Sequence, residues 1–162
     1  MEILDTGNRR EFDTGAKRDM ADGKGRFDLM PLDIVSDISE LIGTDKGFYF
    51  TLLNIANYQE NGNTECLQVA LHNFIDYEYD NYYEMLLELA KHFENGAKKY
   101  GEYNWQKGIP TSSYIDSACR HLTKVYANWN DENHKIAFVW NMICLLWTIK
   151  HKEEVVTNGN NA

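Results

Sequence analysis

With 162 residues, 43% hydrophobic and 13% aromatic, the chain has the composition of one compact domain and not that of a disordered protein. A formal charge of −9 and a pI near 5.0 argue against a general nucleic-acid binder, because no basic stripe is available to displace counterions from phosphates. The sequence has no leader-like start and no apolar stretch long enough to span a bilayer, so we expect a cytoplasmic protein without membrane partners.

The cysteines are too few and too irregularly spaced for a zinc knuckle. They are Cys66, Cys119 and Cys144. We expect reduced thiols that are mostly packed in the interior.

Residues 1–28 are rich in glycine and alternating charges and poor in apolar side chains. This pattern predicts an extended, loop-rich N-terminal arm, not a packed helix. The basic residues of the arm are Arg9, Arg10, Lys17 and Arg18. Two interpretations of them stay open, since they either close over phosphates or are solvated.

Apolar periodicity predicts three helices in the next part of the chain. The first begins just after Pro31 and ends near Gly43. The second covers residues 47–58, although residues 49–53 could equally begin a strand, because a short apolar run does not distinguish the two. The third covers residues 67–74.

The C-terminal half carries three further helix patterns. Residues 82–91 form an amphipathic stripe that Gly96 closes or kinks, and residues 100–110 form a glycine-bounded aromatic loop. Thr111, Ser112 or Ser113 can cap a helix that ends near Tyr126, and the last helix runs from His134 to Lys150. We therefore predict a mainly α fold, a compact helical bundle over residues 29–152, with an extended arm before it and a loose tail at 153–162.

Polar side chains on the last two helices are the most informative candidates for chemistry. Asp116 and Arg120 are one turn apart, as are Ser117 and His121, so both pairs share neighbouring parts of one helix surface. On the last helix, His134 and Asn141 share a face. A short turn between antiparallel helices would bring these sets together.

These residue types suit a divalent cation that neutralises phosphate charge and holds a water. Mg²⁺ prefers oxygen ligands and Mn²⁺ also accepts histidine. Carboxylates are supplied by Asp116, Asp131 and Glu132, while His121 or His134 could be a ligand or a general base and Arg120 could offset phosphate charge. The alternative is structural: an ordinary surface ion pair, solvated turn residues and packed histidines.

The aromatic loop and its flanks offer a second candidate surface. Lys98 and Lys99 precede it, and the rings that a purine could stack on belong to Tyr100, Tyr103 and Trp105. A packed loop with two solvated lysines explains the same pattern. Glu84 and Glu88, one turn apart, are a reserve metal pair, although an exposed amphipathic face accounts for this common spacing.

The sequence resembles a known family through four separated blocks. They are residues 25–31 (GRFDLMP); residues 96–101 (GAKKYG) with Asn104-Trp105 and Lys107-Gly108; residues 114–116 with 120–122 (RHL); and His134 with Trp140-Asn141. This order is similar to that of phage and prophage dATP/dGTP diphosphohydrolases, relatives of the MazG-like nucleotide pyrophosphohydrolases. The similarity covers residues 7–150 in patches and is closest over 94–141.

The resemblance implies a helical fold and metal-dependent removal of pyrophosphate from dATP or dGTP. The positions that match the family are Lys98, Lys99, Asn104, Trp105, Asp116, Arg120, His121, His134 and Asn141. The chain departs from the pattern at Ala137, where relatives often have a second histidine, and in a shorter turn before His134. Residues 43–79 look like an insertion.

Our working hypothesis is therefore a phage nucleotide hydrolase that adjusts the nucleotide pool. One or two Mg²⁺ or Mn²⁺ ions would lie between the last two helices, held by Asp116 and by residues near 131–134. Lys98, Lys99 and Arg120 would hold phosphates, and Trp105 or Tyr100 would stack on the base. The alternatives are a non-catalytic nucleotide-sequestering protein and an oligomeric interaction protein; a homo-oligomer is expected for the hydrolase as well.

Overall fold

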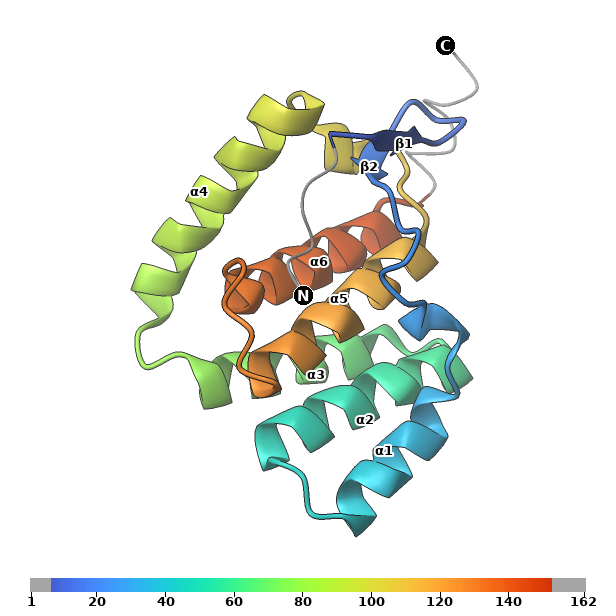
Figure 1. Ribbon diagram of the computed structural model, residues 1–162, viewed down its shortest axis with the longest axis vertical. Helices are drawn as coiled ribbons and strands as arrows, with labels where there is room; N and C mark the ends of the chain where they lie inside the picture. The colour runs from blue at the N-terminus through green and yellow to red at the C-terminus, as the bar shows by residue number, and fades with distance from the viewer. Residues whose placement is uncertain (1–6, 153–162) are drawn as a thin grey trace.

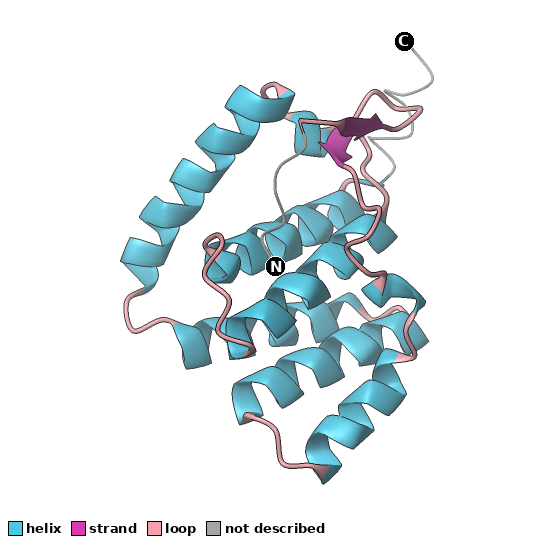
Figure 2. Cartoon of the chain, in the orientation of Figure 1, coloured by secondary structure: helices cyan, strands magenta, loops and turns pink. Residues whose placement is uncertain are grey.

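Six α-helices and one small hairpin make up the regular structure of residues 7–152, the part of the chain that this computed structural model describes (Figures 1 and 2). In chain order the elements are β1 (Arg9–Glu11), β2 (Lys17–Asp19), η1 (Phe27–Leu29), α1 (Leu32–Leu41), α2 (Lys46–Asn61), α3 (Thr64–Glu78), α4 (Tyr82–Tyr100), η2 (Asn104–Gln106), α5 (Thr111–Tyr126) and α6 (His134–Lys150). Here η denotes a short 3₁₀ helix. The mainly α fold is confirmed, and the last helix has the predicted bounds.

Short polar side chains set most helix starts. Asp45 accepts a hydrogen bond from the Gly47 amide at the start of α2, and Asn63 and Asn81 cap α3 and α4 in the same way. Gly62, with a φ of 69°, ends α2 in the left-handed conformation. Together these signals make residues 47–58 helical and exclude the strand alternative.

Two predicted helix ends were wrong. Gly96 does not close α4, which continues to Tyr100 and stops at Gly101, where φ is 94°. A glycine inside a helix costs about 1 kcal/mol relative to alanine, which a long packed helix tolerates. At α5 the N-cap position is Pro110 and no side chain caps the helix; the Ser113 hydroxyl instead accepts a hydrogen bond from Arg10.

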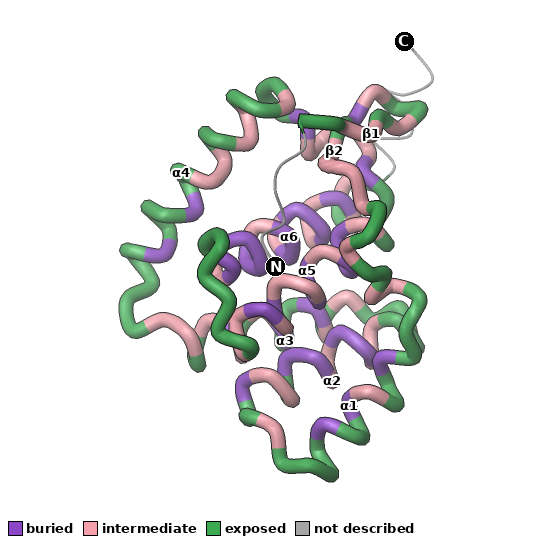
Figure 3. The backbone as a smooth tube through the Cα atoms, in the orientation of Figure 1, coloured by how far each residue is buried: buried purple, intermediate pink, exposed green. Residues whose placement is uncertain are grey.

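Helix α6 lies at the centre of the molecule, which explains why its apolar residues surround its circumference (Figures 1 and 3). It packs along α5, and its Phe138 ring lies 4.2 Å from that of Phe74 on α3. The insertion-like residues 43–79 supply α2 and α3, whose Ile55 and Leu67 are fully buried in the same core. This segment is thus part of the core.

The N-terminal arm is more ordered than a loop. Strands β1 and β2 pair antiparallel with Arg10 opposite Arg18, and Ala16 in their turn is fully buried. The Asn104 side chain accepts a hydrogen bond from the Lys17 amide and donates one to the Lys17 carbonyl, both at 2.8 Å. The predicted extended arm is confirmed, and these contacts hold its hairpin against the helices.

The three cysteines are free, as predicted, and Cys119 and Cys144 are buried. Burial raises the pKa of the Cys119 thiol to about 12, so it stays protonated. None of the helices between residues 7 and 152 combines the length and apolar character needed to cross a membrane. The predicted tail at 153–162 lies outside the described residues.

Candidate functional site

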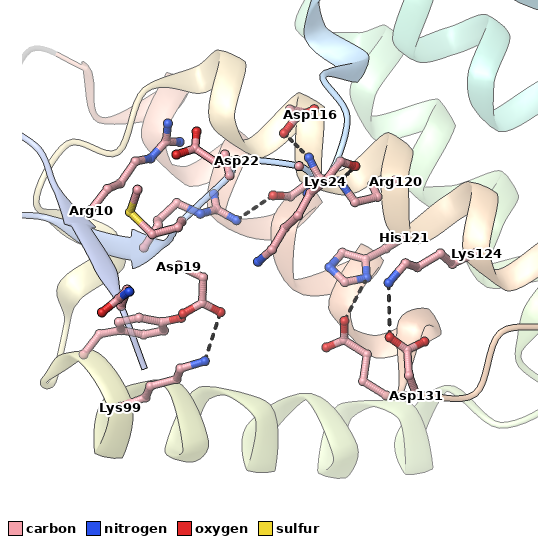
Figure 4. Close-up of a pocket in the computed structure, with 18 residues that line it drawn as sticks. Arg10, Asp19, Asp22, Lys24, Lys99, Asp116, Arg120, His121, Lys124 and Asp131 are labelled. Carbon is pink, nitrogen blue, oxygen red and sulfur yellow. Dashed lines mark hydrogen bonds and ion pairs between the residues drawn. The ribbon is translucent and has the colours of Figure 1, made fainter. Parts of the chain in front are cut away.

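A pocket of about 580 Å³ lies between the arm, the end of α4, helix α5 and the turn before α6 (Figure 4). Its cationic lining residues are Arg10, Arg18, Lys24, Lys99, Arg120 and Lys124. Its acidic lining residues are Asp19, Asp22, Asp116, Asp131 and Glu132. In a protein of net charge −9, this gathering of cations makes the pocket the best described place for an anionic ligand.

Two histidines and one glutamate meet at one wall of the pocket, where His121 and Glu132 line the cavity and His134 is buried. The Nδ1 atoms of His121 on α5 and His134 on α6 are 3.0 Å apart. Glu132, in the turn between the helices, places Oε1 at 3.7 Å from the first nitrogen and 3.6 Å from the second. These three ligand atoms all lie within 4.8 Å of one another, and we call them the His–Glu cluster.

Asp131 orients His134 from the far side of the ring. Its Oδ1 is 2.7 Å from His134 Nε2, and its Oδ2 accepts from Lys124 Nζ at 3.2 Å. Burial acts to raise the pKa of Asp131, but these two hydrogen bonds outweigh it and the pKa is lowered. An ionised Asp131 that accepts the Nε2 proton leaves Nδ1 of His134 as a lone pair facing Glu132.

His121 is held in its neutral form. Burial lowers its pKa well below the usual value, and the neighbouring His134 and Arg120 act in the same direction. A neutral imidazole is the form that binds a metal ion. The cluster thus offers two imidazole nitrogens and one carboxylate, a set that fits Mn²⁺ better than Mg²⁺, which prefers oxygen ligands.

Asp116 and Arg120 lie in the pocket wall but hold the arm. Asp116 Oδ1 accepts the Phe27 amide at 2.7 Å, and Oδ2 pairs with Arg120. The Arg120 guanidinium also donates to the carbonyls of Lys24 and Gly25. Both carboxylate oxygens therefore have protein partners, so the geometry favours positioning of residues 24–27 over the predicted metal ligation by Asp116.

Asn141 lies beneath the hairpin and is almost fully buried. Its Oδ1 accepts from Arg18 Nη2 at 2.9 Å, and its Nδ2 donates to the Ala137 carbonyl. The Ser117 hydroxyl, one turn before His121 on α5, accepts from the same Arg18 nitrogen at 3.0 Å. Asn141 thus positions the guanidinium of Arg18, which lines the pocket.

Lys99 lies across the pocket from His121 in Figure 4, and Tyr100 also lines the pocket. Lys99 Nζ pairs with Asp19 Oδ2 at 2.9 Å, and the Tyr100 hydroxyl donates to Asp19 Oδ1 at 2.7 Å. Burial, followed by the bond to Asp19, raises the pKa of Tyr100 to about 12. The end of α4 is thereby tied to β2.

Other predicted site residues lie outside the pocket. Lys98 is exposed and pairs with Glu94. Trp105 packs edge-on against Trp147, with ring centroids 4.9 Å apart, and does not line the pocket. Glu88 accepts a hydrogen bond from Asn133, the N-cap residue of α6, and is not one of the three clustered residues.

Four charged lining residues were not among the sequence-predicted candidates: Asp19, Asp22, Lys24 and Lys124. Figure 4 shows the Lys24 side chain extending into the space between Asp19 and His121. Burial is the main cause that lowers the pKa of the Lys24 ammonium group. Lys24 lies between two glycines in an aperiodic segment, so its sequence context carried no signal of this position.

The fold and the pocket define an all-helical protein with a cation-rich cavity and a His–Glu cluster between its last two helices. Residues 80–158 match the family model described as dATP/dGTP diphosphohydrolase, N-terminal. That segment contains α4, α5, α6 and the whole cluster. Over these residues the chain is similar to this family. No curated protein and no solved structure matched the chain.

Proposed function

We propose that the protein hydrolyses a purine deoxynucleoside triphosphate, dATP or dGTP, to the monophosphate and pyrophosphate, with Mn²⁺ or Mg²⁺ as cofactor. The observation that carries the proposal is the His–Glu cluster in the wall of a cation-rich pocket, within the segment that matches the family. The family's name supplies the substrate class.

The cluster would hold the cation through His121, His134 and Glu132. A bound divalent cation would supply a polarised water and charge neutralisation at the phosphates. The ionised Asp131 keeps the His134 ring in the orientation that presents Nδ1. Lys24, which extends into the pocket, and Lys99, at the opposite wall, would bind phosphate oxygens as point charges.

The pocket size agrees with this substrate class. A volume of about 580 Å³ lies within the usual range of roughly 300–1,000 Å³ for small-molecule sites. Tyr100, and not Trp105, is the aromatic ring of the loop region that lines the pocket. We therefore propose Tyr100 as the ring beside the base.

The direct test is product analysis with a panel of dNTPs and NTPs, with Mn²⁺, with Mg²⁺ and with EDTA. We expect monophosphate and pyrophosphate from a purine deoxynucleotide, only when metal is present. His134→Ala should remove this activity, and the matched control His72→Ala, an exposed histidine on α3, should retain it. Diphosphate and phosphate as products would contradict the proposed bond cleavage.

One observation favours a second function, sequestration of a nucleotide without turnover. Ala137 is buried at the position where relatives often have a second histidine, so it offers no ligand. A protein with a weakened metal site would bind nucleotide and release it unchanged. Tight binding of dATP or dGTP with no product at any metal concentration would establish this alternative.

We further propose that the protein is a homo-oligomer acting on a cytoplasmic nucleotide pool, such as that of a phage-infected cell. Helix α1 exposes Ile34, Ile38 and Leu41 at helical spacing, and α4 exposes Tyr83 and Leu87. Exposed apolar stripes of this kind are typical of subunit contacts. Light scattering on the wild type and on Leu87→Glu tests this proposal, and a monomeric wild type would contradict it.

A further inference from the structure

Arg18 on β2 carries a charge that no described residue neutralises. Its Nη2 donates to two neutral oxygens, Ser117 Oγ and Asn141 Oδ1. Its guanidinium also lies over the rings of Tyr114 and Trp140, at 5.1 and 5.9 Å from the centroids. These contacts fix the orientation of the cation, but hydroxyl, amide and ring leave its charge uncompensated.

The other terminal nitrogen of Arg18 is buried and has no hydrogen-bond partner. The same holds for Nε of Arg10, which lies opposite Arg18 in the hairpin. A buried donor left without an acceptor costs about 1–3 kcal/mol. Two neighbouring guanidinium groups with unused donors therefore form a site that favours an anion with several acceptor oxygens.

Acidic residues do not fill this role in the described structure. Asp22 lines the same pocket but forms no ion pair with either arginine between residues 7 and 152. Asp19 pairs with Arg9, Lys99 and Tyr100 instead. Neither arginine thus forms an ion pair with a described residue, and burial lowers the pKa of Arg18.

The position of Arg18 relates it to the His–Glu cluster. Its partner Ser117 lies one turn before His121 on α5, and its partner Asn141 lies two turns after His134 on α6. One helical turn rises about 5.4 Å. The guanidinium therefore lies along the same helix seam as the cluster, about one turn away along α5.

We propose that Arg18 and Arg10 form a pyrophosphate-binding site, in which the arm holds the two phosphate groups that leave the nucleotide. This inference rests on the proposed function for the identity of the leaving group. It assigns phosphate recognition to residues that precede the segment matched by the family. Both arginines line the pocket.

The test is calorimetric titration of the full chain with inorganic pyrophosphate in EDTA, so that no metal contributes. Wild-type protein should bind, and Arg18→Gln should weaken binding about 10- to 100-fold, since charge-assisted hydrogen bonds are lost. Arg18→Lys, which keeps the charge but loses the planar fork, should fall between them. Lys17→Gln is the matched control, because it removes an exposed charge from the same strand.

Arg10→Gln provides a second variant should Arg18→Gln fail to fold, as judged by circular dichroism. Equal pyrophosphate affinity in wild type and in the folded arginine variants, or no binding by wild type at millimolar concentration, overturns the proposal. Nucleotide hydrolysis is measured separately. A protein that binds pyrophosphate through Arg18 but cleaves no nucleotide refutes the proposed function and leaves this site standing.

Discussion

The helices that match the family and the arm that precedes them contribute different chemistry to one pocket. Helices α5 and α6 and their connecting turn supply the candidate metal ligands, whereas the arm supplies Arg10, Arg18 and Lys24. The first set is fixed by helix packing, and the second by a few hydrogen bonds and ion pairs to α4, α5 and η2. From this difference we expect that mutations in the arm and in the helices affect nucleotide affinity and turnover separately.

The largest expected effect is on the helical part. Glu132→Gln removes the carboxylate of the His–Glu cluster and should lower turnover by more than about 100-fold, since even outer-shell partners of a metal account for roughly 10–100-fold. Steady-state hydrolysis of the preferred nucleotide measures this. Glu60→Gln, an exposed change near the end of α2, is the matched control. Wild-type turnover in Glu132→Gln would exclude the His–Glu cluster as the catalytic metal site.

Trp105 tests whether the family-matched loop serves the core or the substrate. Trp105 contacts Trp147 and Phe93 edge-on, away from the pocket. Trp105→Ala should therefore reduce the free energy of unfolding by about 3 kcal/mol with KM for nucleotide unchanged. Chemical denaturation and kinetics of the same sample measure both. A raised KM in a stable variant would restore Trp105 as the ring that stacks on the base.

Asn104 tests the attachment of the arm. Asn104→Ala removes two hydrogen bonds to the Lys17 backbone and should cost about 1–3 kcal/mol of hairpin docking. We expect KM to rise about tenfold with little change in kcat, because the phosphate-binding arginines lose their position while the cluster keeps its own. Asn54→Ala, whose side chain donates to a carbonyl within α2, is the control.

A loss of kcat in Asn104→Ala as large as that in Glu132→Gln would show that the arm takes part in the chemical step. The separation between arm and helices would then be wrong.

The smallest expected effect is that of pH on the stability of the docked hairpin. Burial acts to raise the pKa of Asp19, but the bonds from Tyr100 and Lys99 outweigh it, and the folded-state pKa lies below the ordinary aspartate value of 3.8. The ionised carboxylate therefore stabilises the docked hairpin above about pH 3.8, and this contribution is lost as pH falls below it. We expect this carboxylate to contribute less than about 1 kcal/mol to the free energy of hairpin docking, since Asp19 is partly exposed.

Amide exchange of the hairpin between pH 5 and 3, in wild type and Asp19→Asn, measures that contribution. Identical pH profiles in the two proteins would contradict it.

Helical periodicity explains which parts of the fold were predictable. The 3.6-residue pattern in residues 134–150 and the polar pairs on residues 116–121 indicated α5 and α6 and the meeting of His121 with His134. Gly96 misled, because a glycine marks a helix end where the backbone takes a positive φ, as it does at Gly101.

The arm was less predictable because its order comes from long-range contacts. Residues 7–28 have no periodic apolar pattern, and the bonds that dock them join residues about 80–120 positions apart, such as Lys17 with Asn104 and Arg18 with Asn141. The sequence likewise could not reveal that Asp116 has both oxygens engaged. Pairing with Arg120 was expected, but the second partner is the backbone amide of Phe27.

The most direct test of the central claim is electron paramagnetic resonance of Mn²⁺ bound to the protein, with nitrogen couplings resolved by pulsed methods. A cation held by His121, His134 and Glu132 gives ¹⁴N couplings from histidine in the wild type and in His72→Ala. In His134→Ala the couplings weaken together with the affinity for Mn²⁺. Mn²⁺ bound through oxygen ligands alone, or bound equally well by His134→Ala, would contradict the assignment of the metal site.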